Sequence, residues 1–416
     1  MKESGIDWIG QIPEEWEVIK FKYLGDVKQG LTYSPSDIVD KDEGILVLRS
    51  GNIQNGILDF NNNVYVKTKV AESIVLRKND ILITARNGSP ALIGKNAIID
   101  TDITATFGAF MMVFRANKSL FSKFAFYLMN VSFNFYRTFF TTSTVNQLTA
   151  AIFNGIEVPL PSISEQQKIA DFLDKKTAQL DKVKSLLEEQ IQKLKDYRSS
   201  LIYETVTKGL DKTVPMKDSG IDWIGQVPQG WEISKIRYLV TTRSEKRITD
   251  SSIPYIGLES IESQTGKFVE TGIQVDKSEN IVVEIGDVLF GKLRPYLRKY
   301  WRATFPSTAS SEFLVFQSSE LDMNFLYYAI QSDSFIEEVN TSTYGSKMPR
   351  ASWEYIKNMK IAFPSSLVEQ QKIADFLDKK TIQIDKLIQI KNEQIDNINK
   401  QRQTLIYDYV TGKRRV

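Results

Sequence analysis

Glu165-Gln-Gln-Lys-Ile-Ala-Asp-Phe-Leu-Asp-Lys-Lys-Thr177 occurs twice in the chain, because Glu369–Thr381 has the same sequence without a change. Lys2–Trp16 likewise returns, with few changes, as Lys217–Trp231. Both pairs of segments appear in the same order, which predicts an internal two-fold duplication. A solenoid is excluded, because two long units are too few and too large for that class of repeat protein.

A long helical stretch begins at each copy of the repeated segment. No proline or glycine occurs from Ser162 until Gly209, and the hydroxyl of Ser162 or Ser164 is placed to cap a helix. Leucine or isoleucine recurs at every seventh position, which predicts coiled-coil helices. Lys391 interrupts the second series, where Ile388 and Ile395 stand on either side. The expected seam residues are Leu173, Leu180, Leu187, Leu194, Leu201, Leu377, Ile384, Ile398 and Leu405.

Each of these helices has one apolar stripe that needs a partner. A helix over Lys168–Val206 would be about 58 Å long at ~1.5 Å per residue. Two such helices in one chain can cover each other, which we favour over self-association of two chains through the same stripes. An antiparallel pair would use both copies of the repeat symmetrically, with the globular domains at opposite ends and a pseudo-two-fold axis between them.

The rest of each half is predicted to form a compact α+β domain. Runs such as Gly44–Arg49 and Asp80–Thr84 are typical of short strands bounded by turn residues. One amphipathic helix is expected near Leu120–Phe135, with a counterpart near Met323–Val339. The expected fold is therefore α+β, with two globular domains separated by two long helices that form an antiparallel coiled coil. The expected boundaries are 1–163 and 213–367 for the domains, and 164–212 and 368–416 for the helices.

The composition excludes several kinds of chemistry. The 416 residues include no cysteine and no histidine, so disulfides, thiol nucleophiles, imidazole catalysis and Cys/His zinc sites are ruled out. We expect no catalytic residue and no metal ligand. Asp174-Lys-Lys176 and Asp378-Lys-Lys380 resemble part of a nuclease site, but they lie on predicted coil helices and are expected to be solvated. No apolar run is typical of a signal peptide or a membrane span, and a cytoplasmic location is expected.

The net charge of only +2 means that any positive charge for nucleic acid must be local. Basic side chains gather with aromatic ones at similar places in both halves, and polar segments at Thr141–Gln147 and Ser342–Arg350 precede the long helices. Arginine suits guanine edges, asparagine and glutamine suit adenine, and lysine suits phosphates. A solvated surface is the alternative for any single cluster. The candidate DNA-binding residues are Arg86, Asn87, Lys95, Asn146, Gln147, Arg294, Tyr296, Arg298, Lys347 and Arg350.

The whole chain resembles the specificity subunit of type I DNA restriction-modification systems. The resemblance is carried by the paired Ser-Gly-Ile-Asp-Trp-Ile-Gly starts at Ser4 and Ser219, and by the Pro159-Leu-Pro and Phe363-Pro exits into Glu-Gln-Gln-Lys-Ile-Ala-Asp-Phe-Leu-Asp. Tyr255–Ile261 and Gly286–Phe290 are also similar to the target-recognition domains of that family. The ordered duplication makes this resemblance specific.

The resemblance implies a non-catalytic DNA-recognition subunit. In that family each globular domain reads one half of a bipartite target in double-stranded DNA, and the paired helices fix the spacer. The helices also dock two methyltransferase subunits, which bring S-adenosylmethionine. Restriction/translocase subunits, which need ATP and Mg²⁺, complete the complex, so no cofactor is expected on this chain. A coiled-coil adaptor that binds only proteins and a stand-alone DNA-modifying enzyme are the alternatives.

Overall fold

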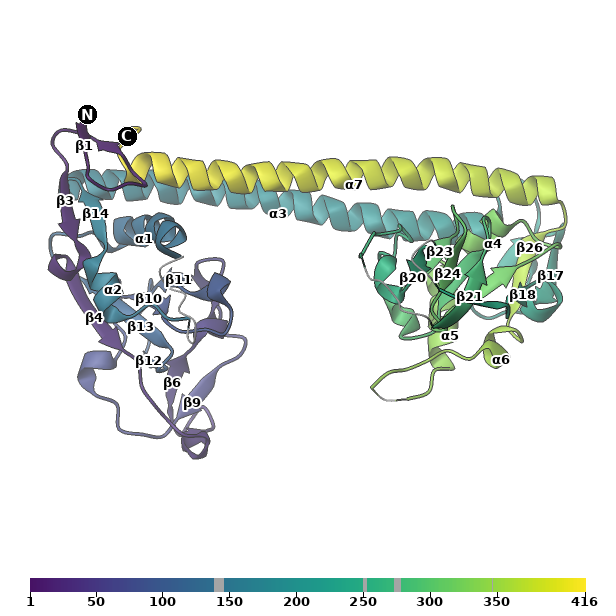
Figure 1. The fold of residues 1–416 in the computed structure, drawn as a ribbon, viewed down its shortest axis with the longest axis horizontal. Helices are drawn as coiled ribbons and strands as arrows, with labels where there is room; N and C mark the ends of the chain where they lie inside the picture. The colour runs from purple at the N-terminus through teal and green to yellow at the C-terminus, as the bar shows by residue number, and fades with distance from the viewer. Residues whose placement is uncertain (138–145, 250–252, 273–277, 346) are drawn as a thin grey trace. The chain divides into compact units, whose positions relative to one another are not determined.

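The computed structural model describes residues 1–137, 146–249, 253–272, 278–345 and 347–416, and the chain forms two compact units (Figure 1). The first unit comprises Met1–Leu186 with Glu393–Val416, and the second comprises Leu187–Asn392. Each unit holds one α+β domain and part of both long helices, so the predicted fold class and duplication are confirmed. Thr141–Val145 and Ser346, which belong to the two polar segments, lie outside the described residues.

The domain of the first unit packs a central antiparallel sheet between a helix and a second sheet. The central sheet has the order β11-β10-β13-β4 and the second has the order β12-β6-β9-β5. The elements are β1 (Lys2–Glu3), β2 (Gln11–Ile12), β3 (Glu17–Lys20), β4 (Gly25–Gln29), β5 (Ile38–Val39), β6 (Ile45–Leu48), β7 (Ile53–Gln54), β8 (Ile57–Leu58), β9 (Val64–Val66), β10 (Ile81–Thr84), β11 (Asn96–Ile98), β12 (Ala105–Phe107), β13 (Met111–Ala116), α1 (Ser122–Tyr136), α2 (Ala150–Gly155) and β14 (Glu157–Leu160).

Alternation along β10 explains this layering. Ile81 and Ile83 enter the core beneath α1, while Leu82 enters the smaller core beneath the second sheet. Successive side chains of a strand point to opposite faces, so a strand buried on both faces is apolar throughout. Val288, Leu289 and Phe290 of β22 divide between two cores in the same way in the second unit.

The second unit repeats the central sheet, with the order β18-β25-β22-β23. Its other sheet has the order β19-β21-β24-β20. The strand that has one parallel and one antiparallel neighbour is β24 in this sheet, whereas it is β6 in the corresponding sheet of the first unit. The elements are β15 (Met216–Asp218), β16 (Gln226–Pro228), β17 (Trp231–Lys235), β18 (Thr241–Thr242), β19 (Lys246–Ile248), β20 (Tyr255–Ile256), β21 (Glu279–Val283), β22 (Val288–Gly291), β23 (Tyr300–Arg302), β24 (Ser307–Ala309), β25 (Phe313–Gln317), α4 (Met323–Ala329), α5 (Asp333–Thr341), α6 (Trp353–Ile356) and β26 (Lys360–Pro364).

Short 3-10 turns connect many of these elements. They are η1 (Phe21–Tyr23), η2 (Pro35–Asp37), η3 (Ser50–Asn52), η4 (Glu72–Ile74), η5 (Pro90–Leu92), η7 (Ile236–Tyr238), η8 (Leu258–Ser260) and η9 (Pro295–Leu297). Within the described residues, no helix is both long enough and apolar enough to cross a membrane.

The domain helices differ in one respect from the expectation. The helix expected near Leu120–Phe135 is α1, but its counterpart is not one helix. Instead α4 ends at Ala329 and α5 starts at Asp333. Ser332 causes the new start, because its side chain accepts a hydrogen bond from the Phe335 N–H as an N-cap. The prediction of one helix over Met323–Val339 is therefore wrong.

The two long helices, α3 (Ile163–Lys208) and α7 (Leu367–Val410), run antiparallel in each unit. In the first unit the rings of Phe172 and Tyr409 lie 4.5 Å apart between centroids, and Asp181 lies 3.6 Å from Arg402. In the second unit Lys391 Nζ donates to Gln190 Oε1 at 2.6 Å, and Arg198 lies 3.6 Å from Asp385. The residue numbers of the contacting positions fall along α7 as they rise along α3, which is the pattern of an antiparallel pair.

The expected seam residues differ in burial. Leu173 and Leu377 are fully buried, but in the domain cores, and Ile384 is also buried. The remaining seam residues, Leu180, Leu187, Leu194, Leu201, Ile398 and Leu405, are half-buried. A two-helix coil covers each stripe from one side only, so this partial exposure is expected of it. The charged pairs Asp181–Arg402 and Arg198–Asp385 occupy equivalent places in the two units.

The repeated segment joins each domain to its long helix. Trp16 Nε1 donates to Glu165 Oε2 at 3.1 Å, and Gln166 Oε1 accepts from the Phe121 N–H at 2.8 Å. The side chain of Gln166 is fully buried, so these bonds satisfy a polar group that has no access to water. The second copy repeats the arrangement, with Trp231 donating to Glu369 at 3.1 Å and Asp322 N to Gln370 at 2.8 Å.

Asp174 connects α3 to α1. Tyr127 donates its hydroxyl to Asp174 Oδ1 at 2.7 Å, and that hydroxyl also lies 3.2 Å from Thr177 Oγ1. Lys123 forms an ion pair with the same carboxylate. Burial, with the nearby carboxylate, raises the pKa of Tyr127 well above its usual value, so the phenol remains a neutral donor.

The second unit has an equivalent network at Asp378. Tyr328 donates to Asp378 Oδ1 at 2.5 Å and lies 3.1 Å from Thr381 Oγ1, while Arg302 Nη1 donates to Asp378 Oδ2 at 3.1 Å. The expectation that Asp174 and Asp378 are solvated is therefore wrong. Both carboxylates are half-buried and connect a domain to a long helix.

We predict that Asp378→Asn loosens the second domain from α7. The change removes the charge that pairs with Arg302 and weakens the bond from Tyr328, which should cost about 1–2 kcal/mol. Amide hydrogen exchange in α4 and α7 measures this loss as faster local opening. Asp171→Asn, at an exposed position of α3, is the control and should leave exchange unchanged. Equal exchange in α4 for Asp378→Asn and the wild type would contradict the prediction.

Candidate nucleic-acid interface

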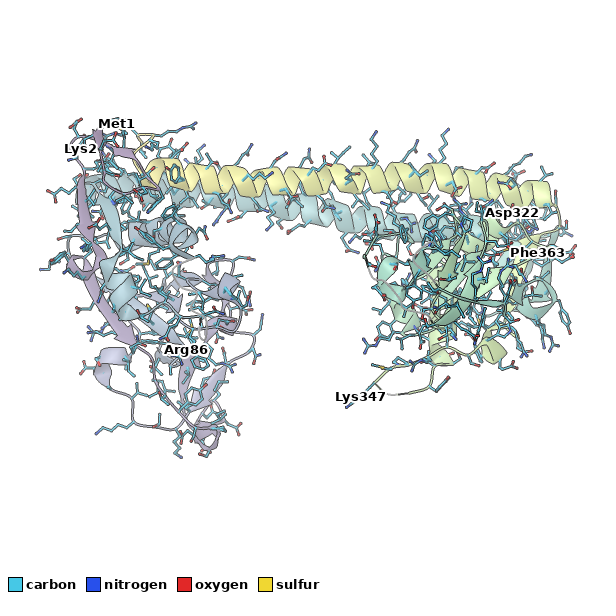
Figure 2. All side chains as sticks on the ribbon, in the orientation of Figure 1. Met1, Lys2, Arg86, Asp322, Lys347 and Phe363 are labelled. Carbon is cyan, nitrogen blue, oxygen red and sulfur yellow. The ribbon has the colours of Figure 1, made fainter. Side chains whose placement is uncertain are left out.

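The candidate residues of the first unit come together where two loops meet. Arg86, which Figure 2 labels, and Asn87 follow β10. Gln147 pairs with Arg86 in an isolated antiparallel bridge. Arg86 Nη2 donates to Gln147 Oε1 at 2.7 Å, and Asn146 Nδ2 donates to the Gly88 carbonyl at 3.4 Å. The loop after β10 and the segment before α2 therefore present one polar surface.

Ser50, at the start of η3, extends this surface. Lys95 Nζ donates to the Ser50 carbonyl at 3.3 Å, and Asn87 Nδ2 lies 3.4 Å from Ser50 Oγ. Burial lowers the pKa of Lys95, because the charged ammonium loses part of its hydration. The guanidinium of Arg86 lies over the ring of Phe110, 5.7 Å from its centroid. These fixed donors suit base edges and phosphates.

The second unit places Arg294 and Arg350 in an equivalent position. Leu293 pairs with Arg350 in a bridge after β22, and the Arg294 N–H donates to the Pro349 carbonyl at 2.7 Å. Arg294 Nη2 also donates to the Lys347 carbonyl at 3.1 Å. Figure 2 shows Lys347 at the end of a loop that extends away from the long-helix side of its own domain.

The loop after β22 carries backbone strain at two arginines. Arg294 has a φ of 51° and Arg298 a φ of 54°, in the left-handed region that costs a non-glycine residue about 1 kcal/mol or more. Between them, η9 carries Tyr296 at its tip, where the side chain is 51% exposed. Residues held at such angles are concentrated at binding and catalytic sites.

Backbone hydrogen bonds show which positions correspond. Ala85 N donates to the Phe110 carbonyl and Leu148 N to the Ala85 carbonyl. In the second unit Lys292 N donates to the Glu312 carbonyl and Ala351 N to the Lys292 carbonyl. Gln147 therefore corresponds to Arg350, and Asn87 to Arg294. We call this pair of loops in each unit, after β10 or β22 and before α2 or α6, the recognition frame.

Two candidates in the second unit have strong acidic partners. Arg350 Nη2 and Nε donate to the carboxylate of Glu312 at 2.9 and 3.1 Å. Arg298 pairs with Asp333, which also accepts a hydrogen bond from Ser199 of α3 at 2.8 Å. Arg298 is thus engaged at the helix junction, whereas Arg294, Lys347 and Arg350 lie within the recognition frame.

Sequence reasoning missed two residues of these sites. Glu312 holds Arg350 across a separation of 38 residues, and no local pattern marks it. Lys299 corresponds to Lys95, because each amine donates to a backbone carbonyl at the equivalent turn of its unit. Lys299 donates to the Ile261 carbonyl and Lys95 to the Ser50 carbonyl. Alignment of the two duplicated halves would have identified Lys299, because it stands at the position of Lys95. Across the described ranges, no group of carboxylates is arranged to hold a metal ion.

Comparisons with known proteins agree with this duplicated arrangement. The model of the type I restriction modification DNA specificity domain matches residues 13–195 and again residues 228–400. The specificity subunit of the type I restriction enzyme MjaVIII from Methanocaldococcus jannaschii is 25% identical over 429 residues, which cover 98% of this chain and 94% of that protein. The EcoKI specificity subunit of Escherichia coli K12 is 32% identical over 198 residues, or 46% of this chain and 43% of that protein.

Solved structures share the fold. A chain from work on complex assembly and conformational transition of the type I R-M system has a TM-score of 0.68 at 16% identity, and the match covers 97% of this chain and 100% of that one. The HsdS subunit from Thermoanaerobacter tengcongensis has a TM-score of 0.52 at 15% identity, over 97% of this chain and 98% of that one. Because the family model matches both halves and together most of the sequence, this chain belongs to the type I restriction-modification DNA specificity subunits.

Proposed function

We propose that the two recognition frames read the two halves of a bipartite target in double-stranded DNA. The family role is DNA target recognition, and the observation that supports this assignment is the shared backbone frame. The same hydrogen bonds hold both frames, yet Asn87 and Gln147 in one stand where Arg294 and Arg350 stand in the other. Amide side chains suit adenine and arginines suit guanine, so the two half-sites should differ in sequence.

The long helices are proposed to set the distance between the half-sites. At ~1.5 Å per residue, the 46 residues of α3 span about 69 Å, or roughly two ~34 Å turns of B-DNA. Such a length suits two major-groove contacts separated by a spacer that is not read. The charged pairs Arg198–Asp385 and Asp181–Arg402 favour one register of the helices, because a slip would leave the charges without partners, at the largest cost for the more buried Arg198 and Asp385.

Two methyltransferase subunits are the proposed partners of the helices. Val183 and Leu186 of α3 are 47% and 49% exposed, and their counterparts Leu387 and Ile390 of α7 are 47% and 41% exposed. We call these the α3 and α7 doublets. Because the two repeats carry similar exposed apolar surfaces, they suit two copies of the same partner.

The chemistry is proposed to belong to those partners. Methyltransferase subunits would bring S-adenosylmethionine, and restriction/translocase subunits would use ATP and Mg²⁺. This chain would remain non-catalytic and would work with its partners in the cytoplasm. Its contribution is to place the partners on one DNA sequence.

We predict that deletion of this gene removes one split motif of methyladenine from the genome of its host. Single-molecule sequencing with the gene present and deleted makes the comparison, and the motif lost gives both half-sites and the spacer. An unchanged map, in a host whose methyltransferase subunit is expressed, would contradict the proposal. A lack of salt-dependent retention on DNA would then favour a protein-binding adaptor, because phosphate contacts give retention that weakens as salt rises.

We predict that Arg294→Ala relaxes the preference for one base pair in the second half-site. Loss of a bidentate contact to guanine should cost about 1–3 kcal/mol at that position alone. Binding to a panel of single-base variants of the target measures the effect. Arg237→Ala, at an exposed position of the same unit, is the control and should leave the preference intact. Uniform weakening across all sequences would instead identify Arg294 as a phosphate contact.

We predict that Leu387→Asp with Ile390→Asp removes one of two methyltransferase subunits. A carboxylate in a desolvated apolar contact is strongly unfavourable, while the α3 doublet stays intact. Native mass spectrometry of the co-expressed complex reports the stoichiometry. Ile285→Asp, at an exposed apolar position of the second domain, is the control and should retain both subunits. Retention of both subunits by the α7 variant would show that the partner binds elsewhere.

A further inference from the structure

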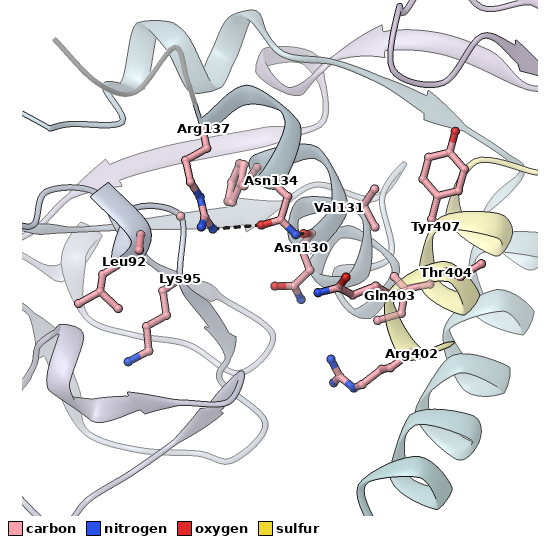
Figure 3. Close-up of a pocket in the computed structure, with 14 residues that line it drawn as sticks. Leu92, Lys95, Asn130, Val131, Asn134, Arg137, Arg402, Gln403, Thr404 and Tyr407 are labelled. Carbon is pink, nitrogen blue, oxygen red and sulfur yellow. Dashed lines mark hydrogen bonds between the residues drawn. The ribbon is translucent and has the colours of Figure 1, made fainter. Parts of the chain in front are cut away.

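A groove of about 530 Å³ lies between α1, the loop before β11 and the end of α7 within the first unit (Figure 3). It is bounded by residues of segments 91–95, 130–137 and 402–407. Figure 3 shows Asn134 on α1, Arg137 just after its end, Arg402 and Gln403 on α7, and Lys95 on the neighbouring loop. We call it the basic groove.

The lining of the basic groove holds three cations and no acid, although Arg402 also pairs with Asp181 at 3.6 Å. Lys95, Arg137 and Arg402 come from three different segments, and the 14 lining residues include no aspartate or glutamate. Arg137 Nη2 donates to Asn134 Oδ1 at 3.0 Å, while its Nε is buried and has no hydrogen-bond partner within the described residues. A buried donor without a partner costs free energy, which an acceptor brought within its reach would recover.

The equivalent place in the second unit is filled by protein. Arg198 corresponds to Arg402, and Arg198 Nη1 donates to the Gln264 carbonyl at 3.3 Å. Lys267 of the same turn pairs with Asp385 at 3.3 Å, and Asp385 also lies beside Arg198. The side chain of Arg198 is accordingly 12% exposed, against 33% for Arg402.

The length of one turn explains this difference. In the first unit Asp59 N donates to the Asn52 carbonyl, so the turn between them is residues 53–58. In the second unit Val269 N donates to the Ser260 carbonyl and encloses the longer stretch 261–268. The longer turn reaches α3 and covers Arg198, whereas the shorter one leaves Arg402 open to the groove.

We propose that the basic groove binds DNA backbone phosphates beside the half-site read by the first domain, and that the second domain has no such contact. The inference rests on the proposed function. Lys95 belongs both to the groove and, through Ser50, to the recognition frame, so the two surfaces are continuous. Guanidinium forks match the geometry of phosphate oxygens, and the carboxylate-free lining favours an anion. DNA binding thereby becomes asymmetric between the two halves of a duplicated protein.

The test is the salt dependence of binding by the assembled complex with its methyltransferase subunits. Arg137→Gln with Arg402→Gln removes two phosphate contacts, so the slope of log K against log salt should become shallower by about 1–2. The base sequences of the two half-sites should not change. Phosphate ethylation should cease to interfere with binding beside the first half-site only. Lys41→Gln with Lys69→Gln, at exposed positions of the same unit, makes an equal change of charge and should leave the slope unchanged.

Each outcome bears on one proposal. Arg402→Lys, which keeps the charge, should retain most of the slope, and unchanged circular dichroism of the variants shows that folding is intact. If the glutamine variant keeps both motif preference and the wild-type slope, the groove proposal fails and the proposed function stands. If the wild-type complex shows no motif preference, both fail. If the variant loses methyltransferase subunits at an unchanged slope, the groove binds an acidic protein surface instead, which overturns the proposal.

Discussion

The hydrogen-bonded carboxylate at the start of each long helix is the contact on which the rest of the structure depends. Asp174 and Asp378 each accept a tyrosine hydroxyl and pair with a cation from the domain. Glu165 and Gln166, at the beginning of the same segment, accept hydrogen bonds from the domain at two further points. These bonds, together with the apolar side chains of the same segment, attach each domain to its long helix within its own unit.

This dependence explains why one segment is identical in both halves while the frames diverge. Ile169, Ala170 and Leu173 enter the domain core between the polar contacts of Glu165, Gln166 and Asp174. A substitution at one of these positions would disturb either the core or a hydrogen bond. The frames are held mainly by backbone bonds, which tolerate any side chain. Asn87 and Arg294 can thus occupy the same place with different chemistry.

The long helices, their pairing and the duplicated domains follow from sequence because heptads, repeats and alternating strands are local patterns. The burial of Asp174 does not, since its partner Tyr127 lies 47 residues earlier. The start of α5 depends on one serine cap, which a continuous apolar pattern conceals. Residue types alone suggested Arg86 and Gln147, but only the fold brings them together across 61 residues. Glu312 belongs to no motif at all, and its role depends on where β25 places the loop before it.

The two units also differ in how the chain assembles them. The second is one continuous stretch, Leu187–Asn392, whereas the first needs Glu393–Val416 as well. Ile406 and Val410 of that last segment are buried in the first domain's core, and Tyr407 donates to the Trp8 carbonyl at 3.1 Å. At ~5–20 residues per second, a ribosome needs about 10–40 s to make the roughly 200 residues in between. The domain translated first is thus completed last, and the apolar side chains that Ile406 and Val410 cover stay uncovered until then.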